Sequence, residues 1–368
     1  RSNLATGYNE ASASFSFDAH DSRPECGPEI YVLVIGETSR AGNWQLNGYG
    51  RPTNPGLSRR DGIINYPKAL SESNTTHKSV PLMMSHLDSE NFGDSIYCSK
   101  GIVDAFAEAG YTTCWISSQQ RNGQLIDYFG ERADEVTFIC DDGRHHYDME
   151  LCPLLDKAIA THADDKLFIV VHTYGSHYNY NERYPAEYNV FAKHPATEAT
   201  PANRNGLIDA YDNSIAYVDA VLDSIIDTVE KYKNPAAVLY LADHGEDIYD
   251  DARKRFLHAS PTPTYWQLHV PMLMWMSESY RATYPQRHRA AMANSRLNVS
   301  SSRSAFHTML DLAGVSSPFF ISTASLCSPS YAEPRRKYLN DYNEAVPLSH
   351  SGLRSSDFAE LIAHRISI

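Results

Sequence analysis

Long hydrophobic runs are missing from this sequence of 368 residues. A helix that crosses a membrane needs about 20 consecutive apolar residues, and the longest apolar runs here, at residues 30–35, 167–171 and 270–276, are far shorter. A secretory signal peptide is missing as well, and the first residue is Arg1 rather than Met. We therefore expect that an upstream segment has been removed.

An excess of positive charge is also missing. Lys and Arg number 32 against 45 Asp and Glu, which gives a formal net charge of −13. This balance excludes a general nucleic-acid binder, which needs a basic face, although a local cationic pocket or a metal stays compatible with it. Hydrophobic residues make up 42% of the chain and exclude overall disorder, and a minority of the 16 His residues are available as metal ligands.

Cysteine is scarce, with only six residues. An even number permits three disulfides in an oxidising compartment. Six free thiols would give the same count, so the number of cysteines leaves both possibilities open.

The first 28 residues differ from the rest of the chain. They are rich in Ser, Ala and Asn, show no periodicity, and are expected to form a tether or a peripheral segment. From Ile30 onward, apolar runs typical of strands buried on both faces alternate with helical patterns. This alternation predicts an α/β fold in which helices flank a mainly parallel sheet, with residues 29–368 as one domain. We expect strands at 30–35, 112–117, 167–171, 236–241 and 270–275, helices at 101–109, 211–231, 306–312 and 357–364, and a long surface loop at 184–205.

Polar side chains follow three of these strands at the point where each strand ends. They are Glu37 after the first strand, His172 and His177 after the third, and Asp243 and His244 after the fourth. Because the carboxyl ends of parallel strands meet at one edge of a sheet, we expect them to converge. Mixed carboxylate and imidazole donors suit Zn²⁺ and, less well, Mn²⁺. Each of these residues, taken alone, also has a purely structural explanation, such as a helix cap for Glu37 or a buried core position for a histidine.

A hydroxyl-rich segment at residues 71–81 offers a reacting group for such a metal site. A Thr beside Zn²⁺ can lose its proton near neutral pH and attack phosphorus. The alternative is a helix N-terminus capped by Ser and Thr. The two are compatible, because a helix N-terminus also favours a phosphate.

Ordered sequence blocks between about residue 30 and residue 314 resemble the phosphoethanolamine transferases, which include the lipid A modifiers behind polymyxin resistance. The blocks are ETSRA at 37–41, NGY at 47–49, RPTNP at 51–55, Thr76, SVP at 79–81, residues 172–177, DHGE at 243–246, LH at 257–258, HVP at 269–271 and FHT at 306–308. The resemblance implies an alkaline phosphatase/sulfatase-type fold for the catalytic domain. It also implies a monomer at the periplasmic face of the bacterial inner membrane, which reaches the membrane surface through an anchor upstream of residues 1–28.

The resemblance further implies a set of site residues. Zn²⁺ is expected on Glu37, Thr76, Asp243 and His244, with Thr76 as the nucleophile and Thr75 as its adjacent rival. His172, His177 and His258 match histidines that line the pocket, contact phosphate or hold a second metal. A substrate-binding Lys of better-known relatives has no match here, and Gln119 or Arg121 is expected in its place.

The reaction implied is a two-step transfer. Thr76 attacks phosphatidylethanolamine and releases diacylglycerol, and the phosphoethanolamine on Thr76 then passes to lipid A or another envelope glycan. A phosphatase or phosphodiesterase, in which water is the acceptor, is the alternative. A sulfatase needs a C/S-x-P-x-R motif that residues 76–80 lack, a lipoteichoic-acid-type transferase fits the first block poorly, and a catalytically inactive binding domain would have lost metal ligands that are intact here.

The resemblance also bears on the cysteines. Many relatives flank the nucleophile with a Cys pair, but Glu72 and Leu82 occupy those places here. Relatives carry disulfides near residues 140–152, so a Cys140–Cys152 bridge is favoured, followed by Cys98–Cys114 and Cys26–Cys327. The alternative is that some of these cysteines are small buried apolar residues.

Overall fold

A seven-stranded sheet forms the centre of the protein in the computed structural model, which describes residues 2–195 and 198–368. Arg1 and residues 196–197, the latter within the loop expected at 184–205, lie outside the described residues. In spatial order the strands are β3 (Ile63–Asn65), β11 (Met272–Met276), β8 (Ala236–Ala242), β2 (Ile30–Gly36), β7 (Leu167–His172), β5 (Thr112–Ser117) and β6 (Glu135–Phe138).

The sheet is mostly parallel. Strand β2 lies between β7 and β8 and pairs with both in parallel, and β5 continues the parallel order to β6. Only β11 runs the other way, antiparallel to both β8 and β3. The predicted α/β class is therefore confirmed, and the sheet is mixed at one side.

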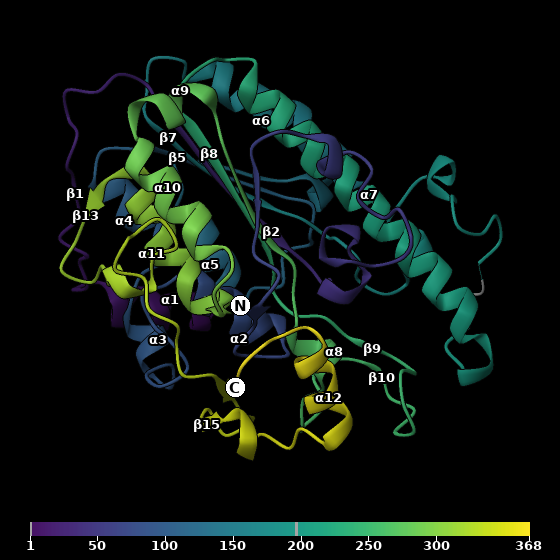
Figure 1. Ribbon diagram of the computed structural model, residues 1–368. Helices are drawn as coiled ribbons and strands as arrows, with labels where there is room; N and C mark the ends of the chain where they lie inside the picture. The colour runs from purple at the N-terminus through teal and green to yellow at the C-terminus, as the bar shows by residue number, and fades with distance from the viewer. Residues whose placement is uncertain (1, 196–197) are drawn as a thin grey trace.

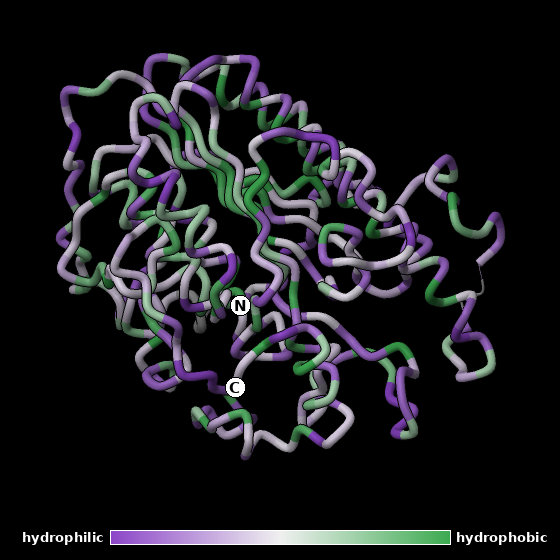
Figure 2. Tube along the Cα trace, viewed as in Figure 1, coloured by the Kyte–Doolittle hydropathy of each residue, from purple (hydrophilic) through white to green (hydrophobic). Residues whose placement is uncertain are grey.

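Two layers of helices cover the sheet and explain its continuous apolar strands. Helices α6 (Leu151–Thr161) and α7 (Arg204–Glu230) pack on one face, against side chains such as Val32 and Ile169. Helices α2 (Thr76–Met83), α4 (Ile102–Glu108), α5 (Leu125–Glu131) and α11 (Ser301–Ala313) cover the other face, as Figure 1 shows. All seven residues of β2 are buried, so neither of its faces meets water; the strands form the hydrophobic centre in Figure 2.

Shorter elements complete the chain. Helix α7 begins at Arg204, seven residues before the expected start, because Leu207 and Ala210 extend its buried stripe toward the N-terminus. The remaining helices are α1 (Ser2–Ser12), α3 (Ser95–Cys98), α8 (Tyr265–Leu268), α9 (Glu278–Thr283), α10 (Pro285–Asn294) and α12 (Ser355–Ala363), and the remaining strands are β1 (His20–Asp21), β4 (Ala69–Leu70), β9 (Asp247–Ile248), β10 (Phe256–Leu257), β12 (Val299–Ser300), β13 (Val315–Ser316), β14 (Lys337–Leu339) and β15 (Ala345–Pro347).

The N-terminal segment lies along the domain. Strand β1 pairs antiparallel with β13, and the fully buried ring of Phe17 has its centroid 5.5 Å from that of Phe306. Within the described residues, the structure contains no helix that combines the length and the apolarity needed to cross a membrane.

The expected disulfides are not formed. All six cysteines are free thiols, and the side chains of the favoured pair have separate neighbours. The Cys140 Sγ donates to the Ser118 carbonyl oxygen (3.0 Å), whereas the Cys152 Sγ lies 4.0 Å from the Val221 carbonyl oxygen. The other two pairings fail in the same way: the Cys114 Sγ lies 4.0 Å from Glu135 Oε2, and the Cys327 Sγ lies 3.9 Å from the Met274 sulfur.

Free thiols have a simple experimental signature. Alkylation of the protein in urea without a reductant should add six alkyl groups, and a reductant should leave the melting temperature unchanged, because no covalent cross-link restrains the unfolded chain. Intact mass and a thermal melt measure the two quantities. A mass that corresponds to fewer than six alkyl groups, restored to six by reduction, would contradict this expectation.

Candidate active site

The carboxyl edge of the sheet brings the predicted ligands together. Gly36 at the end of β2 pairs with Ala242 at the end of β8, so Glu37 and Asp243 emerge side by side from adjacent parallel strands. With His244 they form a buried group in which one ligand atom from each residue lies within 4.8 Å of the others. The predicted convergence of these three residues is therefore present in the structure.

The hydroxyl of Thr76 lies in the middle of this group. Thr76 is the first residue of α2, and its Oγ1 lies 2.6 Å from Asp243 Oδ2, 3.1 Å from His244 Nε2 and 3.2 Å from Glu37 Oε1. The neighbouring Thr75 hydroxyl instead lies 3.4 Å from the Ser73 hydroxyl. One threonine oxygen thus contacts all three ligand-type side chains.

Local hydrogen bonds fix the orientation of these groups. His244 Nδ1 lies 2.7 Å from the Gly245 carbonyl oxygen, an acceptor, which assigns the ring proton to Nδ1 and leaves the Nε2 lone pair facing Thr76. Asp243 Oδ1 accepts from the backbone N–H groups of Thr38 (3.0 Å) and His244 (2.7 Å), so its other oxygen is directed at Thr76. The site is therefore pre-oriented for a positively charged group.

The electrostatics of the site also favour a cation. Burial, together with the negative charge of Glu37, raises the pKa of Asp243 well above its ordinary value. Burial opposes ionisation of Glu37 too, but the neighbouring imidazoles of His244 and His177 and a hydrogen bond from Thr38 lower its pKa overall. Burial lowers the pKa of His244, which favours the neutral, metal-binding imidazole. Two ionised carboxylates would repel each other at this range, and a divalent cation between them would let both ionise.

His177 and His258 lie beside this group. The ring centroid of His258 lies 4.0 Å from that of His244 and 6.5 Å from that of His177. His258 Nδ1 lies 3.1 Å from Glu246 Oε1. Glu246 is fully buried and also accepts a hydrogen bond from the Tyr180 hydroxyl. It ends the DHGE block, yet its sequence position alone does not indicate that it orients His258.

Gln119 and His172, which are expected to bind substrate or line the pocket, each make contacts within the protein. Gln119 Nε2 donates to Glu37 Oε2 (3.1 Å) and to the Thr173 carbonyl oxygen (2.8 Å), so it orients a ligand-type carboxylate. His172 is buried, its Nδ1 lies 3.0 Å from the Ser117 hydroxyl, and its ring packs against Trp115. Burial lowers the pKa of His172 to about 4. His172 is not among the residues that the Thr76 hydroxyl contacts.

The fold and this site define a class of protein. The chain belongs to the sulfatase family, whose family model matches residues 29–315. Among curated proteins, it is 30% identical over 302 residues to phosphoethanolamine transferase EptA of Escherichia coli K12, which covers 79% of this chain and 54% of the relative. It is 27% identical over 347 residues to phosphoethanolamine transferase EptC of the same strain, which covers 90% of this chain and 58% of the relative. The chain thus spans little more than half the length of these relatives.

Solved structures agree with this assignment. The C-terminal periplasmic domain of EcEptC from Escherichia coli, in complex with Zn, superposes with a TM-score of 0.81 at 26% identity, covering 92% of this chain and 97% of that one. The soluble domain of lipooligosaccharide phosphoethanolamine transferase A from Neisseria meningitidis gives a TM-score of 0.75 at 27% identity, covering 84% and 95%. The resemblance to the phosphoethanolamine transferases and the alkaline phosphatase/sulfatase-type fold are confirmed.

Proposed function

We propose that this chain is the catalytic domain of a zinc-dependent phosphoethanolamine transferase, with phosphatidylethanolamine as the donor and lipid A or another envelope glycan as the acceptor. The observation that carries the proposal is the Thr76 hydroxyl, which contacts Glu37, Asp243 and His244 at once. The names of the relatives support the choice of reaction.

The donor set fits zinc. Two carboxylates, a neutral imidazole and a hydroxyl converge on one point, and such oxygen and nitrogen ligands suit Zn²⁺ better than Mn²⁺. Glu37, Thr76, Asp243 and His244 would hold the ion. When bound, it would lower the pKa of the threonine hydroxyl and stabilise negative charge that develops on the phosphoryl group.

The protein residues then have defined roles. Thr76 Oγ1 forms a bond to phosphorus while the bond from phosphorus to the diacylglycerol oxygen breaks, and that oxygen leaves with the hydroxyl proton. In the second step an acceptor oxygen attacks phosphorus, the bond to Thr76 breaks, and the acceptor's proton returns to the hydroxyl. His177 and His258, the latter oriented by Glu246, would donate hydrogen bonds to phosphate oxygens or hold a second metal.

The setting of the reaction is part of the proposal. We place the chain at the periplasmic face of the bacterial inner membrane, as a monomer whose upstream anchor holds the site near phospholipid headgroups. The similarity to the C-terminal periplasmic domain of EcEptC supports this placement.

The test separates transfer from hydrolysis. The zinc-loaded chain is incubated with a fluorescent phosphatidylethanolamine analogue, with and without purified lipid A, and the products are resolved by mass spectrometry. We expect diacylglycerol release, a phosphoethanolamine adduct on the peptide that contains Thr76, and modified lipid A. Free phosphoethanolamine in equal amounts with and without lipid A would identify a hydrolase instead, and no diacylglycerol release would contradict both.

A further inference from the structure

We propose that the C-terminal strand β14 and the residue after it hold the segment 72–78 in place, and that Tyr338 is a positioning residue for Thr76. This inference rests on the proposed function, because Thr76 is the nucleophile only if that function is correct. Strand β14 and Asn340 lie outside residues 29–315, the part of the chain that matches the family, whereas the segment 72–78 lies inside it.

Three contacts join the C-terminal segment to the segment that carries Thr76. The Leu339 N–H donates to the Glu72 carbonyl oxygen at 2.8 Å. The Tyr338 hydroxyl donates to Asn74 Oδ1 at 3.0 Å. On the other side of Thr76, Lys78 Nζ donates to the Asn340 carbonyl oxygen at 2.7 Å. Residues 338–340 therefore hold the chain on both sides of Thr76.

The side chain of Asn74 links this contact to the other side of the site. Its Nδ2 donates to Gln267 Oε1 (2.7 Å) and to the Ser260 carbonyl oxygen (2.9 Å), while its Oδ1 accepts from Tyr338. Asn74 and Tyr338 are each only 1% exposed, so water cannot replace a lost partner at no cost. A change at Tyr338 should therefore shift Asn74, which lies two residues before Thr76, together with the loop that follows His258.

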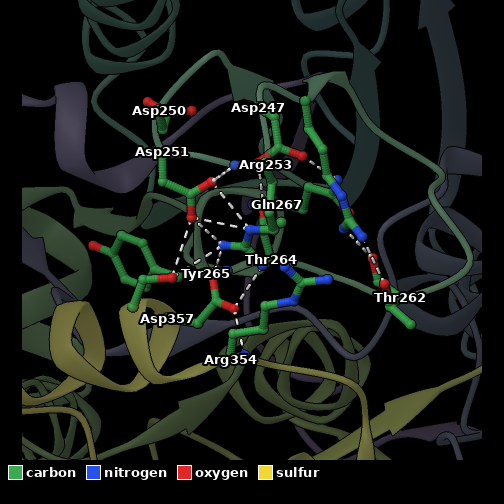
Figure 3. Close-up of polar contacts among 12 residues, drawn as sticks. Asp247, Asp250, Asp251, Arg253, Thr262, Thr264, Tyr265, Gln267, Arg354 and Asp357 are labelled. Carbon is green, nitrogen blue, oxygen red and sulfur yellow. Dashed lines mark hydrogen bonds and ion pairs between the residues drawn. The ribbon is translucent and has the colours of Figure 1, made fainter.

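A buried ion pair attaches the end of the chain to the same region, as Figure 3 shows. Asp357 on α12 is fully buried and accepts from Arg253 Nη2 (2.7 Å), Arg253 Nη1 (2.9 Å) and the Tyr265 N–H (3.0 Å). Arg253 lies in the loop between β9 and β10, just before His258, and Tyr265 opens α8, which also carries Gln267. The C-terminal segment is thus fixed to the β9–β10 loop and to helix α8, as well as to the segment 72–78.

This arrangement also suits a nucleophile segment without a disulfide. Residues 71–82 contain no cysteine. The Glu72 carboxylate accepts from the Ser89 N–H at 2.9 Å, and its backbone carbonyl accepts from Leu339. Hydrogen bonds to residues far along the chain thus restrain the segment.

The test removes a single oxygen. In Tyr338→Phe the buried ring stays and the bond to Asn74 is lost, and since small misplacements of a reacting group are costly, kcat should fall roughly 10-fold. The KM for the fluorescent donor should stay within about twofold, because Tyr338 is buried and its hydroxyl is bonded to Asn74. Hydrogen exchange, which does not depend on turnover, should become faster at amides 73–79.

The matched control is Tyr111→Phe. Tyr111 is equally buried and donates a 3.1 Å bond to the Ala313 carbonyl oxygen at the opposite, amino-terminal edge of the sheet. It should lose similar stability but keep its kcat and the exchange rates of amides 73–79. Equal losses of kcat in both variants, or unchanged kcat and exchange in Tyr338→Phe, would overturn the proposal. Faster exchange in Tyr338→Phe, with no turnover even in the wild type, would overturn the proposed function and leave only the structural restraint.

Discussion

Thr76→Ala should lower diacylglycerol release from a phosphatidylethanolamine analogue by at least about 10³-fold and remove the covalent adduct. The reason is geometric, since Thr76 Oγ1 is the oxygen that contacts Asp243, His244 and Glu37 together. Single-turnover kinetics measure the loss, and peptide mass spectrometry locates the adduct. Thr76→Ser keeps the oxygen and should retain measurable turnover.

The adjacent Thr75→Ala is the matched control for this experiment. It removes the same atoms one residue earlier, but the Thr75 hydroxyl contacts Ser73 rather than the ligand-type residues, so we expect turnover within about 10-fold of the wild type. An adduct on Thr75, or equal losses in the two alanine variants, would reassign the nucleophile.

Much of the fold could be predicted from the sequence, because strands buried on both faces leave an unmistakable pattern. The runs that form β2 and β8 are apolar at every position. The change from apolar to polar residues after each run marks the end of the strand. The direction of β11 could not be predicted in this way. An antiparallel strand that is covered on both faces has the same composition as a parallel one, and only its pairing with β8 reveals its direction.

The ligand group of the site was also predictable, for a related reason. Glu37 and Asp243 directly follow residues that pair across parallel strands, so the sheet alone brings them together. The roles of Asn74 and Tyr338 depend on a contact between side chains 264 residues apart, and the role of Glu246 depends on how the chain between β9 and β10 returns His258 to it. The predicted disulfides were wrong because cysteine count and family resemblance do not determine which neighbour each thiol meets.

Metal removal should also lower turnover strongly. Dialysis against a chelator should lower diacylglycerol release by at least about 100-fold, and added Zn²⁺ should restore it. Zinc binds only the folded site formed by Glu37, Asp243, His244 and Thr76, so the metal-free protein should also melt at a lower temperature, as expected when a ligand that binds only the folded state is withdrawn. Turnover and a thermal melt on the same samples measure both effects. Unchanged turnover in protein shown by elemental analysis to be metal-free would contradict the metal assignment.

The pH dependence of zinc binding follows from the same carboxylate pair. Because burial and Glu37 raise the pKa of Asp243, its carboxyl holds a proton in the metal-free protein at pH values where an ordinary aspartate, with a pKa of about 4, is ionised. Zinc must displace that proton, so between the ordinary and the raised pKa the apparent affinity should rise with pH, by up to about tenfold per unit for each proton released. His244 contributes little to this slope near neutral pH, because burial lowers its pKa and its ring is already neutral. Calorimetry in buffers of different ionisation enthalpy counts the protons. Asp243→Asn, which carries no such proton, should bind zinc more weakly and with a flatter pH profile, and an equally steep profile in that variant would assign the proton to another group.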